Sequence, residues 1–241
     1  MKDAATSTDG VAAEIARELR ESILAGDLTS DQRLPGEPEL AERFGVSRPT
    51  IREALKRLAA QNLIRSRRGP TGGTFVNRIS WGEANESLAV LSQLVIGMQG
   101  ADPAEVIETR LALLKSCLPF AAKRRDASHI DTMRAEVEVQ RSGKTSDEDF
   151  CASDVRFHRA LADAAGNPML SFQMAGVVEG MQPLLNLITY QARDREVIAA
   201  GHEEIAEAIE ARDAKTAEAA LSRMAAYVSG LAAGMLSRKT T

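Results

Sequence analysis

The chain has 241 residues, of which 44% are hydrophobic and 27% are charged, and its formal net charge at pH 7 is −4. This balance excludes a disordered or fibrous protein, and the length suits one large domain or two ordinary ones. Only two cysteines occur, without paired spacing, so the sequence contains neither a disulfide framework nor a zinc-finger pattern. No segment approaches the ~20 apolar residues that span a bilayer, and the N-terminus lacks the apolar core of a signal peptide, so we expect a cytoplasmic protein.

The distribution of charge divides the chain into two parts. Residues 43–78 contain nine basic residues and one acidic residue, whereas residues 79–241 carry a net charge of −6. A basic segment joined to an acidic one indicates a polyanion-binding domain attached to a domain with another role. Taken alone, the charge run is equally consistent with a solvated surface. Low aromatic content, 4%, and many Ala, Leu, Glu and Arg residues favour helix throughout.

The first predicted helix follows a polar segment. Residues 1–10 contain no apolar pattern, and we expect them to be disordered. From residue 11 onward, apolar residues recur at helical spacing until Gly26 marks a stop. An N-terminal domain over residues 11–78 is therefore predicted to begin with this helix.

A helix-turn-helix is predicted next. One short helix fits residues 37–44, and a tight turn at Gly45 leads to Ser47, the N-cap of a helix that extends from residue 48 to about residue 61. The apolar stripe of this third helix consists of Ile51, Ala54, Leu55 and Leu58. The positions off that stripe are Arg48, Thr50, Arg52, Lys56 and Arg57. Hydroxyl and guanidinium groups on the N-terminal turns suit the major groove of DNA, where arginine pairs with guanine.

A basic β-hairpin completes the N-terminal pattern. The runs "LIRSRR" and "GTFV" are β-prone and flank the turn "GPTGG". The segment "RLPGEPELAERFGVSRPTIREALKRLAAQNLIRSRRGPTGGTFV" closely resembles the winged-helix DNA-binding domain of the GntR family of bacterial transcription regulators. The resemblance rests on an "LP-x-E-x-x-LA" entry, a "GVSR-x-T-[IV]-R-x-AL" turn and a Gly-tipped wing.

This resemblance implies which residues contact DNA. They are Ser47, Arg48, Thr50 and Arg52 at the recognition helix, and Arg68 and Gly69 at the wing. Pro38 is a departure from the family pattern, because several members carry at this position an arginine that reaches DNA.

Residues 79–241 show helical patterns without a convincing strand or an internal repeat. We expect residues 79–100 to form a linker and a first helix, and residues 101–236 to form an all-α domain, which the family resemblance described below implies to be effector-binding. The predicted helices cover residues 83–99, 103–126, 127–141, 147–165, 168–191, 194–211 and 213–236. The expected fold class is mainly α, with an N-terminal winged helix-turn-helix that includes a small β-hairpin wing and a C-terminal antiparallel all-α bundle.

Three polar residues are predicted to face the interior of that bundle. Asp154 and His158 lie four residues apart on one helical face, and His202 lies on the apolar stripe of a later helix. One carboxylate and two imidazoles form a partial ligand shell for Zn²⁺, Mn²⁺ or Ni²⁺. Two simpler interpretations remain open from the spacing alone: an i,i+4 pair on one helix, and a histidine satisfied within the core.

The same region resembles the C-terminal domain of the FadR subfamily of GntR regulators, which is the all-α FCD type. The similar motifs are "D-x-x-FH-x-AL", "GNP" and "H-x-x-I-x-x-AI". The resemblance implies a divalent metal held by one Asp and three His, with a small carboxylate effector completing its coordination. Asp154, His158 and His202 match three ligand positions. Met224 stands where the fourth histidine is expected, and thioether sulfur is a poor ligand for hard divalent ions.

Arg110 is the candidate effector-binding residue. In "VIETRLALL" it matches a family arginine that reaches the effector, and a guanidinium can recognise a carboxylate bidentately. An arginine on the surface of an amphipathic helix is the alternative interpretation. Leu114 replaces the glutamate usual in this pattern, so we expect a pocket that accepts a more apolar acid.

These features predict a ligand-responsive, sequence-specific transcriptional regulator, with repression as the favoured mode. A homodimer would bind a palindromic double-stranded DNA operator, and the effector would alter operator affinity. One alternative is a metal-dependent hydrolytic enzyme, although the sequence offers no evident general base beyond the ligands. The other is a non-specific DNA-binding protein without an effector, which a stronger salt dependence of binding would reveal.

Overall fold

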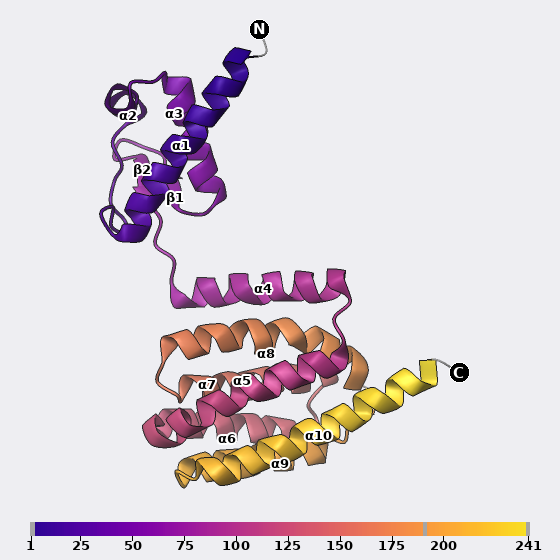
Figure 1. The fold of residues 1–241 in the computed structure, drawn as a ribbon. Helices are drawn as coiled ribbons and strands as arrows, with labels where there is room; N and C mark the ends of the chain where they lie inside the picture. Colours follow the sequence, from indigo (N-terminus) through magenta and orange to yellow (C-terminus); the bar gives the residue numbers. More distant parts are fainter. Residues whose placement is uncertain (1–2, 190–191, 240–241) are drawn as a thin grey trace. The chain divides into compact units, whose positions relative to one another are not determined.

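A computed structural model describes residues 3–189 and 192–239 of the chain (Figure 1). The described residues form ten helices and one two-stranded sheet, which confirms the mainly α fold class. Contacts divide the chain into two compact units, Met1–Ile79 and Ser80–Thr241. Within the described part, no helix is both long enough and apolar enough to cross a membrane.

The N-terminal unit is a winged helix-turn-helix. Its elements are α1 (Asp3–Ala25), α2 (Glu37–Phe44), α3 (Arg48–Ala60), β1 (Ile64–Arg67) and β2 (Gly73–Val76). The two strands pair antiparallel, with Ile64 opposite Val76. Helices α1 and α2 both pack on α3, and their apolar side chains form one core that includes Ile15, Leu19, Leu40, Ile51 and Leu58.

The turn between α2 and α3 follows from two residues. Gly45 ends α2 with φ at 64°, in the left-handed region that glycine enters without steric cost. Ser47 then caps α3, because its hydroxyl accepts a hydrogen bond from the Thr50 backbone N–H at 3.3 Å. The predicted turn and the predicted N-cap are therefore both confirmed.

The prediction of a disordered segment over residues 1–10 is wrong for its described part, because α1 already begins at Asp3. Residues 1 and 2 lie outside the described residues. Once the segment that begins at residue 11 is helical, extension toward the N-terminus avoids the cost of nucleating a new helix. Asp9 also forms an ion pair with Arg57 of α3, which ties the added turns to the rest of the unit.

The C-terminal unit contains seven helices in the described part of the chain. They are α4 (Trp81–Gln99), α5 (Pro103–Arg124), α6 (Ala127–Arg141), α7 (Asp147–Asp163), α8 (Pro168–Thr189), α9 (Arg195–Glu210) and α10 (Ala214–Lys239). Helix α4 lies along α8, α6 packs on α7 and α9, and α10 packs on α5 and α9 (Figure 1). All seven predicted helices occur, although residues 190 and 191, predicted to end one of them, lie outside the described residues.

The core of this unit is apolar except at a few positions. Its largest buried side chains include Phe150 and Phe157. In the same core, His158 is 3% exposed and His202 is 0% exposed. Burying an imidazole costs free energy unless the ring has hydrogen-bond partners, so the contacts of these two residues decide what they can do.

Candidate DNA-binding surface and metal centre

The outer face of α3 presents two arginines near its N-terminus. Ser47, Arg48 and Arg52 are all exposed. The Arg52 guanidinium donates to the Glu37 carboxylate of α2, with Nη2 2.8 Å from Oε2 and Nε 3.3 Å from Oε1. The hydrogen bond from Arg52 lowers the pKa of Glu37 from its ordinary value, so this pair is charged at neutral pH. Arg52 is thus held across the turn in an orientation that points it away from the core.

Thr50 does not share this surface. The sequence pattern placed Thr50 off the apolar stripe, but its side chain lies inward and is 3% exposed. The physical reason is local, because its hydroxyl lies 2.8 Å from Ser47 Oγ, the capping atom of α3. The predicted exposure of Thr50 is therefore wrong, and its hydroxyl supports the cap.

The wing carries exposed arginines around a compact turn. Arg68 and Gly69 lie between β1 and β2, where both are exposed, and Gly69 has φ at 110°. A Cβ added at Gly72 would lie 2.4 Å from the Arg67 carbonyl oxygen, so the turn requires glycine there. Arg65, farther down the hairpin, forms an ion pair with Asp31. The tip thus presents Arg68 to the surroundings, whereas Arg65 helps hold the hairpin on the unit.

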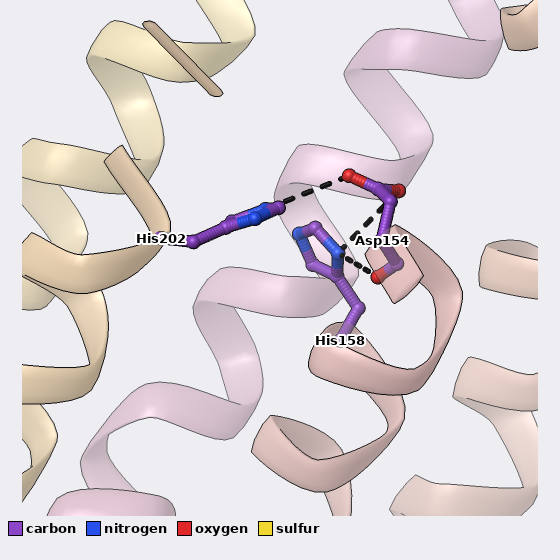
Figure 2. Close-up of side chains that lie close together, drawn as sticks. All are labelled: Asp154, His158 and His202. Carbon is purple, nitrogen blue, oxygen red and sulfur yellow. Dashed lines mark hydrogen bonds and ion pairs between the residues drawn. The ribbon is translucent and has the colours of Figure 1, made fainter. Parts of the chain in front are cut away.

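In the bundle, the three predicted metal ligands come together. Asp154 and His158 project from α7 and His202 from α9, and one ligand atom from each lies within 4.8 Å of the others. Figure 2 shows the His202 ring extending toward the Asp154 carboxylate, with the His158 ring beside it. His202 Nε2 lies 3.5 Å from Asp154 Oδ1, and His158 Nδ1 lies 3.7 Å from Asp154 Oδ2. The spacing along one helix predicts only that Asp154 and His158 are neighbours. The approach of His202 to them is a tertiary contact between α9 and α7.

A chain of hydrogen bonds fixes the proton on His202. Its Nδ1 lies 2.7 Å from Gln140 Oε1, while Gln140 Nε2 donates to Ser153 Oγ at 3.1 Å. The Ser153 hydroxyl donates in turn to the Glu136 carbonyl oxygen at 3.0 Å. Because Gln140 presents its oxygen, His202 Nδ1 must be the donor, and Nε2 carries the lone pair. This Nε2 is buried and has no hydrogen-bond partner among the described residues.

His158 is held in the same way. Its Nδ1 lies 2.9 Å from the backbone carbonyl oxygen of Asp154, an acceptor that calls for an N–H on that nitrogen. In the tautomer that donates to this carbonyl, Nε2 of His158 carries the lone pair. Metal-binding histidines usually donate their second ring N–H to a carbonyl or carboxylate, which fixes the ring orientation. His202, and His158 in this tautomer, therefore match the arrangement expected of metal ligands.

Arg110 reaches the same cluster from α5. Its Nη2 lies 2.8 Å from Asp154 Oδ2 and 3.0 Å from His158 Nδ1, and its Nη1 donates to Gln182 Oε1 of α8 at 2.9 Å. Its side chain is only 12% exposed, so the alternative of a surface arginine is wrong. The sequence analysis did not identify Gln182 and Gln140 as part of this cluster. The signal that could have identified them is a glutamine on a helix face that is otherwise apolar and faces the core.

The electrostatics of the cluster follow from burial and from this guanidinium. Burial alone would raise the pKa of Asp154, but the positive charge of Arg110 holds that pKa below its usual range. Burial, together with the charge of Arg110, lowers the pKa of His158 to about 4. Burial and the neighbouring His158 lower the pKa of His202 to about 3. At neutral pH the cluster therefore contains an ionised carboxylate and two neutral imidazoles, the protonation states that metal binding requires.

Met224 lines the cavity beside this cluster. The cavity, which is partly open to solvent, has a volume of about 690 Å³ and is bordered by Arg110, Asp154, His158 and Gln182, with mostly apolar side chains around the rest. Met224 is 9% exposed and packs on Gly201, where an added Cβ would lie 2.5 Å from the Met224 sulfur. One carboxylate and two imidazoles suit Zn²⁺, Mn²⁺ or Ni²⁺, whereas the thioether adds little for such ions. The residues present therefore fit a metal held by three protein ligands.

Comparisons with known proteins agree with both units. Residues 11–76 match the family "Bacterial regulatory proteins, gntR family", and residues 105–226 match the FCD domain. The chain is 33% identical over 175 residues to the "Putative L-lactate dehydrogenase operon regulatory protein" of Escherichia coli K12, covering 70% of this chain and 64% of that protein. It is 30% identical over 157 residues to the "HTH-type transcriptional repressor NanR" of Klebsiella aerogenes, covering 64% of this chain and 58% of that one. The chain thus spans less than two thirds of the length of these relatives.

A solved structure shows the same fold. The GntR protein of Streptococcus agalactiae superposes with a TM-score of 0.56 at 22% identity, covering 90% of this chain and 98% of that one. The family and the named relatives are transcription regulators and not enzymes. The chain therefore belongs to the GntR family of bacterial regulatory proteins, and its FCD domain places it in the FadR subfamily.

Proposed function

We propose that this protein is a ligand-responsive transcriptional regulator that binds operator DNA through α3 and the wing. The observation that carries the proposal is the exposed N-terminal face of α3, where Ser47, Arg48 and Arg52 project from a winged helix in the basic segment of the chain. A recognition helix reads base edges with the residues of its N-terminal turns. Because DNA is the partner, we propose the cytoplasm as the place of action.

Arg52 is the proposed base-reading residue. Its guanidinium already presents two N–H groups side by side to the Glu37 carboxylate. The same fork can donate to the O6 and N7 atoms of guanine. Arg52 is exposed and Glu37 is partly exposed, so Arg52 can exchange Glu37 for a base at little cost. Arg68 and Gly69 at the wing would add contacts to the backbone or the minor groove, which position the protein without specifying sequence.

The Arg52→Ala variant tests this assignment. A selection of bound sequences from random duplex DNA should show that the variant loses preference at one position of each half-site. The expected loss of discrimination there is roughly ten- to a hundredfold. Arg17→Ala is the matched control, because Arg17 also forms an exposed ion pair in this unit, with Glu21 of α1. An Arg52→Ala variant that selects the same sequences as the unmodified protein would refute the role of Arg52.

A homodimer is the proposed assembly, and α4 supports it. One face of α4 leaves five apolar side chains exposed: Val90, Leu91, Leu94, Val95 and Met98. The opposite face packs tightly on α8, where an added Cβ at Gly180 would lie 2.4 Å from Ser92 Cβ. A contiguous apolar face of this kind marks a protein interface. We propose that a second copy of the chain covers this apolar face of α4, and that the two-fold axis of the dimer matches a palindromic operator. A Leu94→Asp variant places a charge in this interface and should sediment as a monomer.

The proposed effector is a small carboxylate bound in the cavity of the FCD domain. Arg110 lines this cavity and offers guanidinium N–H groups, and a Zn²⁺, Mn²⁺ or Ni²⁺ ion held by Asp154, His158 and His202 would supply a Lewis-acidic position for a carboxylate oxygen. Relatives named as a lactate dehydrogenase operon regulator and as a repressor support both a carboxylate effector and repression. The effector must bind the two operator-affinity states unequally to act as a signal.

A further inference from the structure

Arg110 lies beside the position that a metal would take and shares the Asp154 carboxylate with it. Its Nη2 is 2.8 Å from Asp154 Oδ2, one of the two oxygens that the carboxylate can offer to an ion. The same nitrogen is 3.0 Å from His158 Nδ1, and a guanidinium that donates there leaves the ring proton on Nε2, the nitrogen that would bind an ion. A guanidinium and a divalent cation repel each other at such distances, and burial strengthens the repulsion. The single negative charge of Asp154 can therefore stabilise the guanidinium or a metal ion fully, but not both at once.

The His158 ring shows the same competition. Its Nδ1 is within hydrogen-bond distance of the Asp154 carbonyl oxygen, at 2.9 Å, and of Arg110 Nη2, at 3.0 Å. One ring nitrogen cannot donate to the first and accept from the second at once. When Arg110 moves away, Nδ1 is free to keep its proton on the carbonyl, and Nε2 becomes the ligand atom. Departure of Arg110 thus settles the tautomer that metal binding requires.

We propose that Arg110 is a displaceable counter-ion of Asp154 that lies against the metal position of the cluster and is released into the cavity when a divalent ion binds. This inference rests on the metal and the carboxylate of the proposed function. It assigns Arg110 two successive partners, Asp154 in the metal-free protein and the effector carboxylate in the metal-bound protein. Metal and effector then bind cooperatively, because the metal exposes the residue that recognises the effector.

Gln182 can remain a hydrogen-bond partner of the Arg110 guanidinium after its release. Its Oε1 accepts from Arg110 Nη1 at 2.9 Å, and its own amide donates to Asn186 Oδ1 at 2.9 Å, which fixes the orientation of the amide. Both Arg110 and Gln182 line the cavity. Arg110 can therefore turn about this retained hydrogen bond and bring Nη2 into the cavity without losing every partner.

The test uses zinc alone, measured by chelator competition on the full chain. Arg110→Met and Arg110→Gln remove the competing charge, so both should bind Zn²⁺ at least about tenfold more tightly than the unmodified protein. Arg110→Lys keeps the charge and should stay nearer the unmodified affinity. Arg156→Met is the matched control, because it breaks an ion pair between Arg156 of α7 and Glu136 of α6 and should leave zinc affinity unchanged.

The outcomes separate this inference from the proposed function. Equal or weaker zinc binding by both Arg110→Met and Arg110→Gln would overturn the counter-ion role of Arg110. Absence of zinc binding by every variant and by the unmodified protein would also overturn it, together with the metal of the effector site. Operator binding, measured on the same preparations, would remain intact in both cases if the DNA-binding part of the proposed function is correct. The Gln variant retains a hydrogen-bonding side chain and keeps the test decisive if the Met variant unfolds.

Discussion

Two arginine–carboxylate pairs of this protein, one in each unit, have the same shortest distance and different surroundings. Arg52 and Glu37 meet at 2.8 Å on the surface of the winged helix, with side chains 58% and 35% exposed. Arg110 and Asp154 meet at 2.8 Å inside the bundle, with side chains 12% and 14% exposed. Water therefore competes much more for the members of the first pair than for those of the second. Distance alone therefore does not tell how easily an ion pair can be exchanged.

This difference suits the two proposed tasks. A surface pair contributes little to stability, so Arg52 can leave Glu37 for DNA without a large penalty. A buried charge left without a partner is costly, so Arg110 can leave Asp154 only when another cation takes its place. The N-terminal unit is thus suited to an exchange with a polyanion, and the C-terminal unit to an exchange between cations.

The largest expected effect comes from breaking the buried pair. Asp154→Ala leaves the Arg110 guanidinium in the interior without its carboxylate, and we expect the bundle to lose about 3–5 kcal/mol of unfolding free energy. Urea denaturation of the full chain with a chelator present, followed by circular dichroism, measures this loss. Glu204→Ala is the control, since Glu204 forms an exposed pair with Arg223 in the same unit. A loss for Asp154→Ala no larger than that of the control would show that the buried pair does not stabilise the bundle.

An intermediate effect is expected at Gln140, which orients His202 from α6. Gln140→Leu removes the acceptor for Nδ1–H, and zinc affinity should fall by about 10–100-fold. Gln140→Glu keeps an acceptor at this position and should lose much less. Chelator competition measures both variants. Zinc binding by the leucine variant as tight as that of the unmodified protein would mean that Gln140 does not position the histidine.

The smallest effect is expected from breaking the exposed pair. Glu37→Ala frees Arg52 from its surface partner, and operator affinity should change by less than about threefold at moderate salt. The difference should shrink further as salt increases, because exposed charges are screened. Titration of operator DNA at two salt concentrations tests this. A loss of binding comparable to that of Arg52→Ala would show instead that Glu37 is needed to orient the recognition arginine.

Local patterns in the sequence predict much of this fold. Helix boundaries follow from apolar periodicity and from caps such as Ser47, and the turn follows from Gly45, because these signals act within a few residues. Asp154 and His158 could be paired from a spacing of four residues. The position of Thr50 was misjudged because its hydroxyl bonds the cap, a choice that periodicity does not reveal.

Contacts between distant residues could not be predicted in the same way. Arg110 meets Asp154 across 44 positions of the chain, and Gln140 meets His202 across 62. Such contacts depend on how four helices, α5, α6, α7 and α9, pack together. The sequence offers several partners of suitable chemistry for each of these residues. The resemblance to a family pointed to Arg110 and to the ligands, but the competition between them for Asp154 appears only in three dimensions.

The most direct test of the buried cluster as a ligand site is the metal content of untagged protein purified without chelator. The account predicts about one divalent ion per chain, held by three protein ligands, and its loss in the His158→Ala variant. Metal-free protein that still binds its operator would contradict the metal site. In that case the polar end of the cavity would consist of the Arg110–Asp154 pair alone, and Met224 would mark a site that no longer holds an ion.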